Sequence, residues 1–181
     1  SPFAFSLITD VIYEKMPYYA YSSLKKEQQK MMRERGWTKG SQKVNRFLFR
    51  LVNRVQPDTI IEVGRPSSTT LYLQSAKPSA SYLFASDLSE LFLDADTSVD
   101  FLYLNDYRNP DLLEEVFRIC AHRTTSKSVF VVHGICYSKE MKTLWKKLQT
   151  DERVGITFDL YDLGLLFFDK TKIKQQYIVN F

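Results

Sequence analysis

The chain has 181 residues, of which 44% are hydrophobic and 25% charged, with a formal net charge of +4. This size and composition fit one globular domain, and the mild charge argues against the dense basic tract typical of nucleic-acid-binding proteins. Two cysteines and two histidines are too few for a disulfide framework or a zinc-type motif, which favours a reducing, cytoplasmic location. The chain has no apolar run of roughly 18 residues that would predict a membrane span, and no secretory signal.

The N-terminal part of the sequence predicts helices. Apolar residues between Phe3 and Ile12 recur near a 3.6-residue spacing, as in an amphipathic helix. The stretch Pro17 to Tyr21 breaks this pattern. Ser22 or Ser23 is then predicted to cap a second, charged helix.

A third amphipathic helix is predicted over residues 43–55, where Pro57 ends it. Gly36 and Gly40 flank the loop before it. The lysines and arginines of this N-terminal region offer a nucleic-acid contact as one alternative. Because acidic residues interrupt them, a solvated helix face is favoured.

The middle of the chain follows an α/β pattern. Short apolar runs bounded by turn residues predict strands buried on both faces of a parallel sheet, at residues 59–63, 82–86, 101–104 and 129–132. Helical stretches alternate with them, at residues 69–75, 110–123 and 138–149. Pro110 suits a helix start and Ser138 a cap.

Three β-type runs end the sequence, at residues 155–161, 165–168 and 177–181. Their connections are too short for helical crossovers, so we expect these strands to pair antiparallel. The sequence thus predicts a single domain with a helical region, a β/α core and an antiparallel tail, at residues 1–57, 58–150 and 151–181. The chain begins with Ser1-Pro2 rather than methionine, which is compatible with a fragment of a longer protein.

The first predicted strand leads into a turn that resembles a nucleotide-binding loop. Residues 58–70 read DTIIEVGRPSSTT, so a β-branched run reaches Gly64 and then a bend. Such loops usually contain more glycine, because the backbone turns tightly and a ligand comes close. Here Pro66 also removes a backbone donor.

In the order of its motifs, the chain resembles the class I methyltransferase family that uses S-adenosylmethionine (SAM). That fold is a Rossmann-like, mostly parallel seven-stranded sheet with its last strand reversed. The likeness is nearer to a subgroup common in Bacteroidetes, similar to the catechol-type O-methyltransferases. It covers most of the chain and rests on Ser1–Phe5, Pro17–Tyr21, Ile60–Gly64, Ser68–Leu73 and residues 157–160 and 164–168.

The resemblance implies Glu62, Gly64 and Asp87 as cofactor-binding residues. Gly64 matches the glycine that approaches the methionine part of SAM. Asp87 lies 23 residues later, where a carboxylate would accept hydrogen bonds from both ribose hydroxyls. The alternative is a helix cap, because Asp87 and Ser89 precede a short apolar stretch.

The third strand of the family fold is predicted to be missing. Only twelve residues, Leu88 to Val99, separate the second strand from the next one. A crossover with its helix needs roughly 10–12 residues, so one short helix fits but a strand and two helices do not. One wall of the adenine pocket is lost, and a sheet edge is left open.

The metal site of the catechol-type relatives is also altered. The resemblance implies oxygen ligands for Mg²⁺ after the fourth and fifth strands, but these places hold Asn105, Asp106, His133 and Gly134. We therefore predict no metal site, with Asn105, Asp106 and His133 lining the acceptor side. His133 is either a general base or a structural histidine, and a Cys136–His133 nucleophile pair is a third alternative.

Two functions follow. The first is a degenerate methyltransferase-like protein without catalysis and without tightly bound SAM, which serves as a binding or assembly module, with a homodimer as one form. The alternative is an active SAM-dependent O-methyltransferase acting on a small molecule. The first is favoured because the glycine loop, the adenine-side segment and the metal acids are altered together.

Overall fold

The computed structural model describes residues 1–15 and 18–181. They form two compact units: a helical unit of Ser1–Gln56 and Pro66–Ala80, and a sheet unit of Pro57–Arg65 and Ser81–Phe181. That the whole chain is a single domain stays a prediction. Pro17, where the predicted helix break begins, lies outside the described residues.

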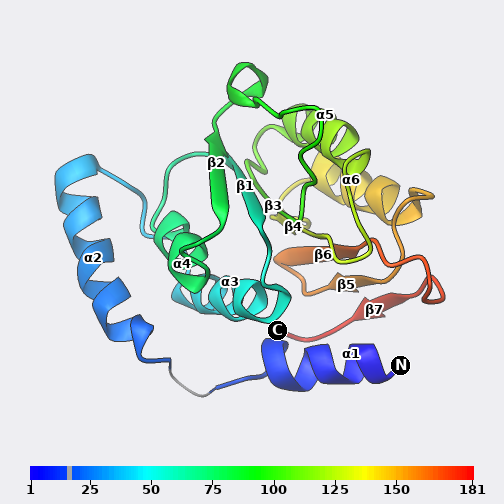
Figure 1. Ribbon diagram of the computed structural model, residues 1–181, viewed down its shortest axis with the longest axis horizontal. Coiled ribbons are helices and arrows are strands. Elements are labelled where there is room, and N and C mark those ends of the chain that lie inside the picture. The colour runs from blue at the N-terminus through cyan, green and yellow to red at the C-terminus, as the bar shows by residue number, and fades with distance from the viewer. Residues whose placement is uncertain (16–17) are drawn as a thin grey trace. The chain divides into compact units, whose positions relative to one another are not determined.

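The helical unit contains the predicted N-terminal helices and the helix predicted after the first strand (Figure 1). Its elements are α1 (Pro2–Leu7), the π-helical turn η1 (Ile8–Ile12), α2 (Ala20–Arg35), α3 (Gln42–Val55) and α4 (Thr69–Ala76). The predicted cap of α2 is wrong, because that helix already begins at Ala20. The hydroxyls of Ser22 and Ser23 lie inside the helix and donate to the carbonyls of Tyr19 and Ala20, which is a common alternative for such side chains.

Helix α3 organises this unit. Ser41 caps it by accepting the Val44 N–H, and its buried side packs against α4 and η1. Arg50 on this helix is buried and donates from Nε to the Val11 carbonyl at 2.7 Å and from Nη2 to the Ile12 carbonyl at 3.4 Å. These carbonyls end η1 and have no partner within that turn, so a cation there stabilises both.

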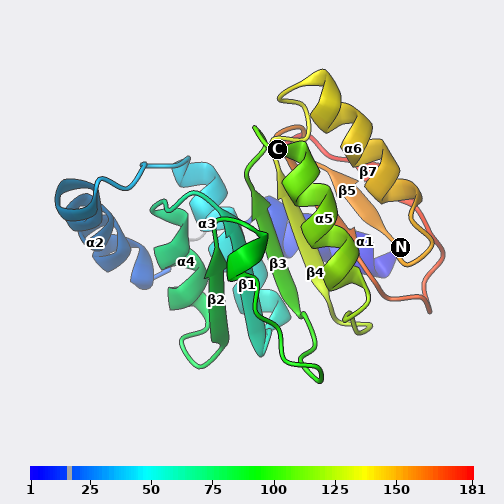
Figure 2. The ribbon, with the colours of Figure 1, turned by 90° about the horizontal axis from the view of Figure 1, so that it is seen from above.

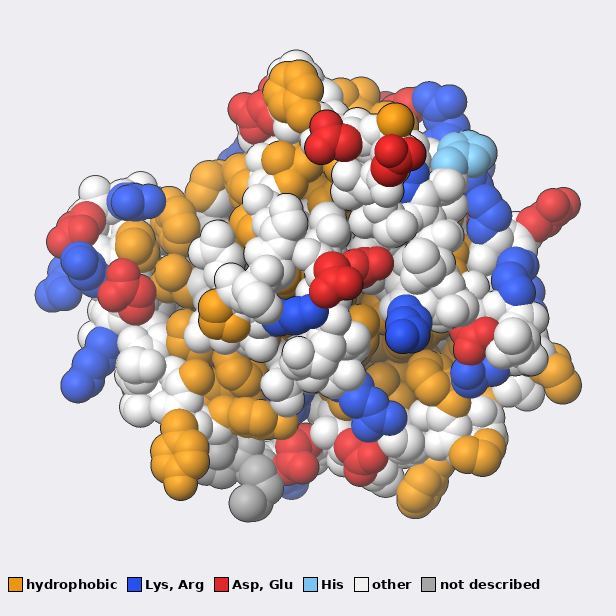
Figure 3. All heavy atoms as spheres, in the orientation of Figure 1, with side chains coloured by type: hydrophobic (Ala, Val, Ile, Leu, Met, Phe, Trp, Pro, Cys, Tyr) orange, Lys and Arg blue, Asp and Glu red, His pale blue; other side chains and the backbone are white. Residues whose placement is uncertain are grey.

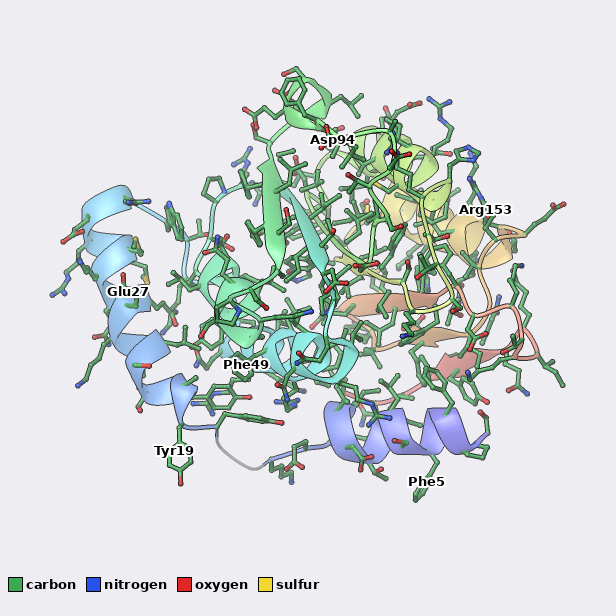
Figure 4. The ribbon with its side chains drawn as sticks, in the orientation of Figure 1. Phe5, Tyr19, Glu27, Phe49, Asp94 and Arg153 are labelled. Atoms are coloured by element: carbon green, nitrogen blue, oxygen red, sulfur yellow. The ribbon has the colours of Figure 1, made fainter. Side chains whose placement is uncertain are left out.

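Aromatic side chains join α2 and α4 to α3. The Phe49 ring, labelled in Figure 4, lies 5.3 Å from both the Tyr18 and the Tyr21 ring centroids, and Tyr72 of α4 completes the cluster. Phe5 of α1 and Tyr19, just before α2, instead point into solvent (Figure 4). The predicted amphipathic pattern at the N-terminus thus holds for Leu7, Val11 and Ile12 but not for Phe5.

The sheet unit is built on seven strands (Figures 1 and 2). They are β1 (Thr59–Gly64), β2 (Ser81–Ala85), β3 (Phe101–Asn105), β4 (Val129–His133), β5 (Thr157–Asp159), β6 (Leu163–Phe167) and β7 (Gln176–Ile178), in the spatial order β2-β1-β3-β4-β6-β5-β7. Among the described strands only β6 is antiparallel to its neighbours, and all other pairs of strands are parallel. The predicted class, a mostly parallel α/β sheet with an antiparallel end, is therefore confirmed.

Helices α5 (Pro110–Ala121) and α6 (Lys139–Thr150) lie side by side on one face of this sheet (Figure 2). Asn109 and the predicted Ser138 cap them, accepting the N–H of the residue three positions on at 3.3 and 3.1 Å. Both helices pack on a core formed by alternate strand residues. That core leaves Glu62, Tyr103 and His133 on the opposite face of the sheet, because side chains alternate along a strand.

The segment between β2 and β3, all of which is described, contains only the 3₁₀ turn η2 (Leu88–Glu90). The predicted absence of a further strand here is confirmed, and β2 is the end strand of the sheet. The segment still covers part of the core, because Leu91 and Leu93 pack against it. Arg123 holds the following loop by donating to the carbonyl of Asp94.

The predicted pairing of the last strand is wrong. β7 pairs parallel with β5, with Phe158 opposite Tyr177, although β5 and β6 pair antiparallel as expected. β6 already has β4 and β5 on its two sides, so β7 can join only at the outer edge of β5. A strand that reverses direction after β6 then runs parallel to β5.

The surface carries scattered large apolar side chains, with Phe5, Phe92 and Ile178 among the most exposed. Figure 3 shows hydrophobic and acidic side chains together over η2 and the loop that follows it. Among the described helices, none is both long enough and apolar enough to cross a membrane.

Candidate functional site

Gly64 ends β1 beside Asn105, the last residue of β3. Its φ of +147° is a conformation that side chains rarely adopt, and an added Cβ would lie 2.7 Å from the Asn105 carbonyl oxygen and 3.3 Å from the Asp106 nitrogen. The neighbouring strand therefore requires glycine here, whether or not a cofactor binds. The structure brings Gly64, Asn105 and Asp106 together at the carboxyl ends of β1 and β3, where α/β sheets commonly bind ligands.

The loop after β1 has its polar groups occupied within the helical unit. Ser67 forms a parallel bridge with Thr38, and the Ser68 N–H donates to the Thr38 carbonyl at 3.0 Å. The Ser68 hydroxyl donates to the Lys39 carbonyl. Both donors of Ser68, which a cofactor loop would offer to a ligand, are thus already engaged.

Asn45 of α3 fixes the same loop and was not predicted as a site residue. Its Nδ2 donates to Ser68 Oγ at 3.3 Å, and its Oδ1 accepts from Thr69 Oγ1 at 2.6 Å. All three side chains are buried. The sequence contained a signal, since Asn45 precedes the buried Leu48 and Val52 by three and seven residues and so lies on the apolar face of its helix.

Glu62, predicted to bind the cofactor, is fully buried on β1. The Tyr82 hydroxyl of β2 donates to its carboxylate. Tyr103 lies level with it on β3, where burial first and the charge of Glu62 second raise the pKa of the Tyr103 hydroxyl well above its usual value. Glu62 thus has partners inside the sheet unit.

His133 connects the ends of β3 and β4. Its Nδ1 lies 2.9 Å from the Tyr103 hydroxyl and 2.9 Å from Asn105 Oδ1. Burial lowers the pKa of the His133 imidazole, partly opposed by the charge of Asp162, so the ring is neutral near pH 7. Two of the three predicted catalytic residues, Asn105 and His133, therefore contact each other.

Asp106, the third predicted catalytic residue, follows directly in the chain. Its main-chain carbonyl accepts the Asn109 N–H at 2.8 Å, which forms the turn into α5. Within residues 1–15 and 18–181 there is no group of three or more His, Cys, Asp or Glu side chains placed to hold a metal ion.

Asp87 adopts the helix-cap role that was one of its two alternatives. Its carboxylate accepts from the Ser89 N–H at 2.8 Å and from the Ser89 hydroxyl. These hydrogen bonds lower the pKa of the exposed Asp87 carboxyl. Beside it, the Ser86 N–H and hydroxyl donate to Glu90 at 2.7 and 2.9 Å, so the end of β2 and η2 form one self-contained turn.

Aromatic rings surround His133, a feature that the sequence did not reveal. The Tyr107 ring lies 5.5 Å from the imidazole and 4.5 Å from the Tyr137 ring. Gly134 has a φ of +75°, and a Cβ there would lie 2.5 Å from the Tyr107 Cβ, so this residue allows the ring to pack. Burial and nearby carboxylates raise the pKa of the Cys136 thiol, the opposite of what an activated nucleophile needs.

Solved structures with a similar fold include three methyltransferases. TomG, an O-methyltransferase from Streptomyces achromogenes involved in tomaymycin synthesis and crystallised with SAM, matches with a TM-score of 0.62 and 14% identity over 91% of this chain and 96% of its own. An O-methyltransferase from Bacillus cereus in complex with S-adenosylhomocysteine (SAH) matches with a TM-score of 0.59 and 13% identity, over 90% of this chain and 96% of its own. The SAH-bound methyltransferase PaMTH1 of Podospora anserina matches with a TM-score of 0.60 and 7% identity, over 92% of this chain and 95% of its own.

No protein-family model matches the sequence, and no curated protein matches it. At these low identities the likeness shows the fold alone. The chain therefore shares the Rossmann-like fold of these methyltransferases, and function has to be argued from the site residues.

Proposed function

We propose that the chain is a degenerate methyltransferase-like protein that does not transfer methyl groups and serves as a binding or assembly module. We also propose that, among proteins of this fold, it is most similar to the catechol-type subgroup. The observation that supports this proposal is the internal hydrogen bonding of Ser68, Thr69 and Asp87, which stand where cofactor contacts are expected. Its cytoplasmic location stays a prediction.

The ribose contact is the first argument. An acid that binds both ribose hydroxyls needs carboxylate oxygens directed at the ligand. Asp87 instead uses Oδ1 for both Ser89 contacts. A ligand would have to compete with the cap of η2, and the shortened segment after β2 provides no additional helix to enclose the adenine.

The acceptor side is the second argument. Catalysis through a bound Mg²⁺ would use it to lower the pKa of a substrate hydroxyl, and magnesium prefers carboxylate oxygens and water to imidazole. In this chain the corresponding places hold Asn105 and His133, which contact each other at 2.9 Å, and one carboxylate, Asp106. A single carboxylate beside an amide and an imidazole does not fit that ion.

Isothermal titration calorimetry with SAM and with SAH tests the proposal. We expect no dissociation constant below about 1 mM, an affinity worth roughly 4 kcal/mol. The variants Asp87→Ala and Asp96→Ala, both at exposed positions, should behave like the parent protein. A micromolar constant that only Asp87→Ala weakens would reject the proposal.

One observation favours the alternative, an active O-methyltransferase on a small molecule: the fold matches SAM- and SAH-bound enzymes over at least nine tenths of the chain. In that case Glu62, Gly64 and Asp87 would hold SAM, while Asn105, Asp106 and His133 would line the acceptor side. The neutral imidazole of His133 suits a general base.

A methyl-transfer assay distinguishes the two functions. Labelled SAM is incubated with pooled phenolic acceptors and the parent protein or His133→Asn. The proposed function predicts no transfer by either protein, whereas the alternative predicts transfer that falls about a hundredfold in the variant.

A further inference from the structure

β2 is the end strand of the sheet, at the position where the family resemblance implies one more strand outside it. The chain leaves β2 through the η2 turn and returns to β3 without adding a strand. An end strand offers main-chain N–H and C=O groups along its outer edge as a template for another strand.

Hydrogen bonds around β2 show which residues direct their main chain outwards. The Ser81 N–H donates to the Asp58 carbonyl on the β1 side at 2.8 Å. Because successive residues of a strand direct these groups to opposite edges, Leu83 also faces β1 and Phe84 faces outwards. The outward N–H of Ser86 donates to Glu90, so the Glu90 side chain ends the available edge at that residue.

The two edges of the sheet differ in how they are protected. β7 has three residues, and lysines 170, 172 and 174 precede it closely. β2 reads SYLFA, without charge or proline, and charge and proline are the usual devices that prevent edge pairing. Leu88 and Phe92, exposed at 42% and 79%, lie in the segment that follows β2, where Figure 3 shows apolar side chains at the surface.

We propose that β2 pairs antiparallel with β2 of a second copy of this chain, about a two-fold axis at Leu83. In this register Phe84 of each copy lies opposite Tyr82 of the other, and the pair exchanges main-chain hydrogen bonds. The Tyr82 phenol remains bonded to Glu62, and its ring faces Phe84 of the partner subunit as an aromatic cross-strand pair. The two copies form one continuous sheet.

Charge selects the antiparallel direction. Residues 86–98 contain Asp87, Glu90, Asp94 and Asp96 and no lysine or arginine. Parallel pairing would place these two acidic segments beside each other, and like charges that meet at an interface cost several kcal/mol. Antiparallel pairing separates them by the length of the strands. A two-fold arrangement also closes on itself and does not extend into a fibre.

This inference rests on the proposed function, because it names the partner of the assembly module. Its test is separate, since the oligomeric state does not depend on whether SAH binds. A negative result for dimer formation therefore does not change how the SAH titration is interpreted, and the converse also holds.

The first measurement is the mass in solution, determined by sedimentation equilibrium at protein concentrations of about 5–100 μM. This twentyfold range of concentration corresponds to about 1.8 kcal/mol in the free energy of association. The parent chain is expected to form a dimer. Phe84→Pro removes the outward N–H and should shift the dimer constant at least tenfold towards monomer, since edge strands tolerate proline. The matched control is Ile178→Pro on β7. The N–H of the next residue, Val179, donates to the Asp159 carbonyl of β5 at 2.9 Å. The N–H of Ile178 therefore faces the outer edge of β7, as that of Phe84 faces the outer edge of β2.

The second measurement does not depend on tolerance of proline. Facing residues at a non-hydrogen-bonded antiparallel position have Cα atoms about 4.5 Å apart, within the range for a disulfide. In a Cys136→Ser background, Leu83→Cys should form a disulfide-linked dimer under mild oxidation, and Ile178→Cys should not. A monomeric parent chain, a dimer that Phe84→Pro leaves intact, or equal cross-linking of both cysteine variants would each overturn the proposal.

Discussion

Replacing Asn45 by alanine tests whether the loop after β1 is held by this one side chain. The substitution removes the contacts to Ser68 Oγ at 3.3 Å and from Thr69 Oγ1 at 2.6 Å. Each bond contributes roughly 0.5–1.5 kcal/mol net, and a buried hydroxyl left without a partner costs roughly 1–3 kcal/mol. Since Ser68 keeps its bond to Lys39, we expect a loss of about 2–4 kcal/mol, which lowers Tm by about 10 °C for a chain of this size.

Urea denaturation followed by circular dichroism measures this loss, with Asn53→Ala as the control because Asn53 is exposed on the same helix. Asn45→Asp sharpens the test. The aspartate keeps an acceptor for the Thr69 hydroxyl but turns a carboxylate oxygen towards Ser68 Oγ. Because the Ser68 hydroxyl already donates its proton to the Lys39 carbonyl, the two oxygens repel each other. Asn45→Asp should therefore destabilise the fold as much as Asn45→Ala at pH 7. A loss for Asn45→Ala no larger than that of Asn53→Ala would refute the reasoning.

Three further outcomes are expected. Gly134→Ala should cost about 3 kcal/mol by urea titration, because its φ of +75° strains alanine and its Cβ would meet Tyr107, whereas Gly36→Ala, with a φ of +63° and open space, should cost only about 1 kcal/mol. Because the pKa of His133 is lowered in the fold, the unfolded chain binds more protons just below pH 6.5 and stability falls as pH drops through that window; His133→Asn should flatten this slope between pH 7 and 5. Arg50→Met should cost about 3 kcal/mol, because the Val11 carbonyl loses a charged donor at 2.7 Å, and Arg46→Met at an exposed position should cost far less.

Most of the fold could be predicted from local patterns. The apolar run at Val129–Val132 and the capping serine at Ser138 each have a single structural explanation, and both predictions are confirmed. The direction of β7 could not be predicted, because it depends on which strand edges are already occupied. The start of α2 was misplaced because the Ser22 and Ser23 hydroxyls donate to the carbonyls of Tyr19 and Ala20 inside the helix, a role that the residue type does not distinguish from capping.

The candidate site was only partly predictable. Sequence order placed Asn105 and His133 at the ends of neighbouring strands, and the structure joins them. Tyr103 was missed because a tyrosine in an apolar strand is typical of a core, although its position two residues before Asn105 puts both on one face. For Asp87 the sequence left two roles open, because a carboxylate that accepts from ribose and one that caps a turn look the same until its partner is known.

The internal bonds of the loop after β1 also set the scale of the affinity to expect. A ligand that takes the Ser68 N–H or hydroxyl must displace the carbonyls of Thr38 or Lys39, and one that takes the Thr69 hydroxyl must displace Asn45. Each exchange replaces one hydrogen bond by another and so forfeits the roughly 0.5–1.5 kcal/mol net that a new bond would contribute. Over three such groups the loss is about 1.5–4.5 kcal/mol, or roughly 10- to 2000-fold in dissociation constant. A micromolar site is thereby weakened towards millimolar, which is the range that separates the module from the enzyme in the SAH titration.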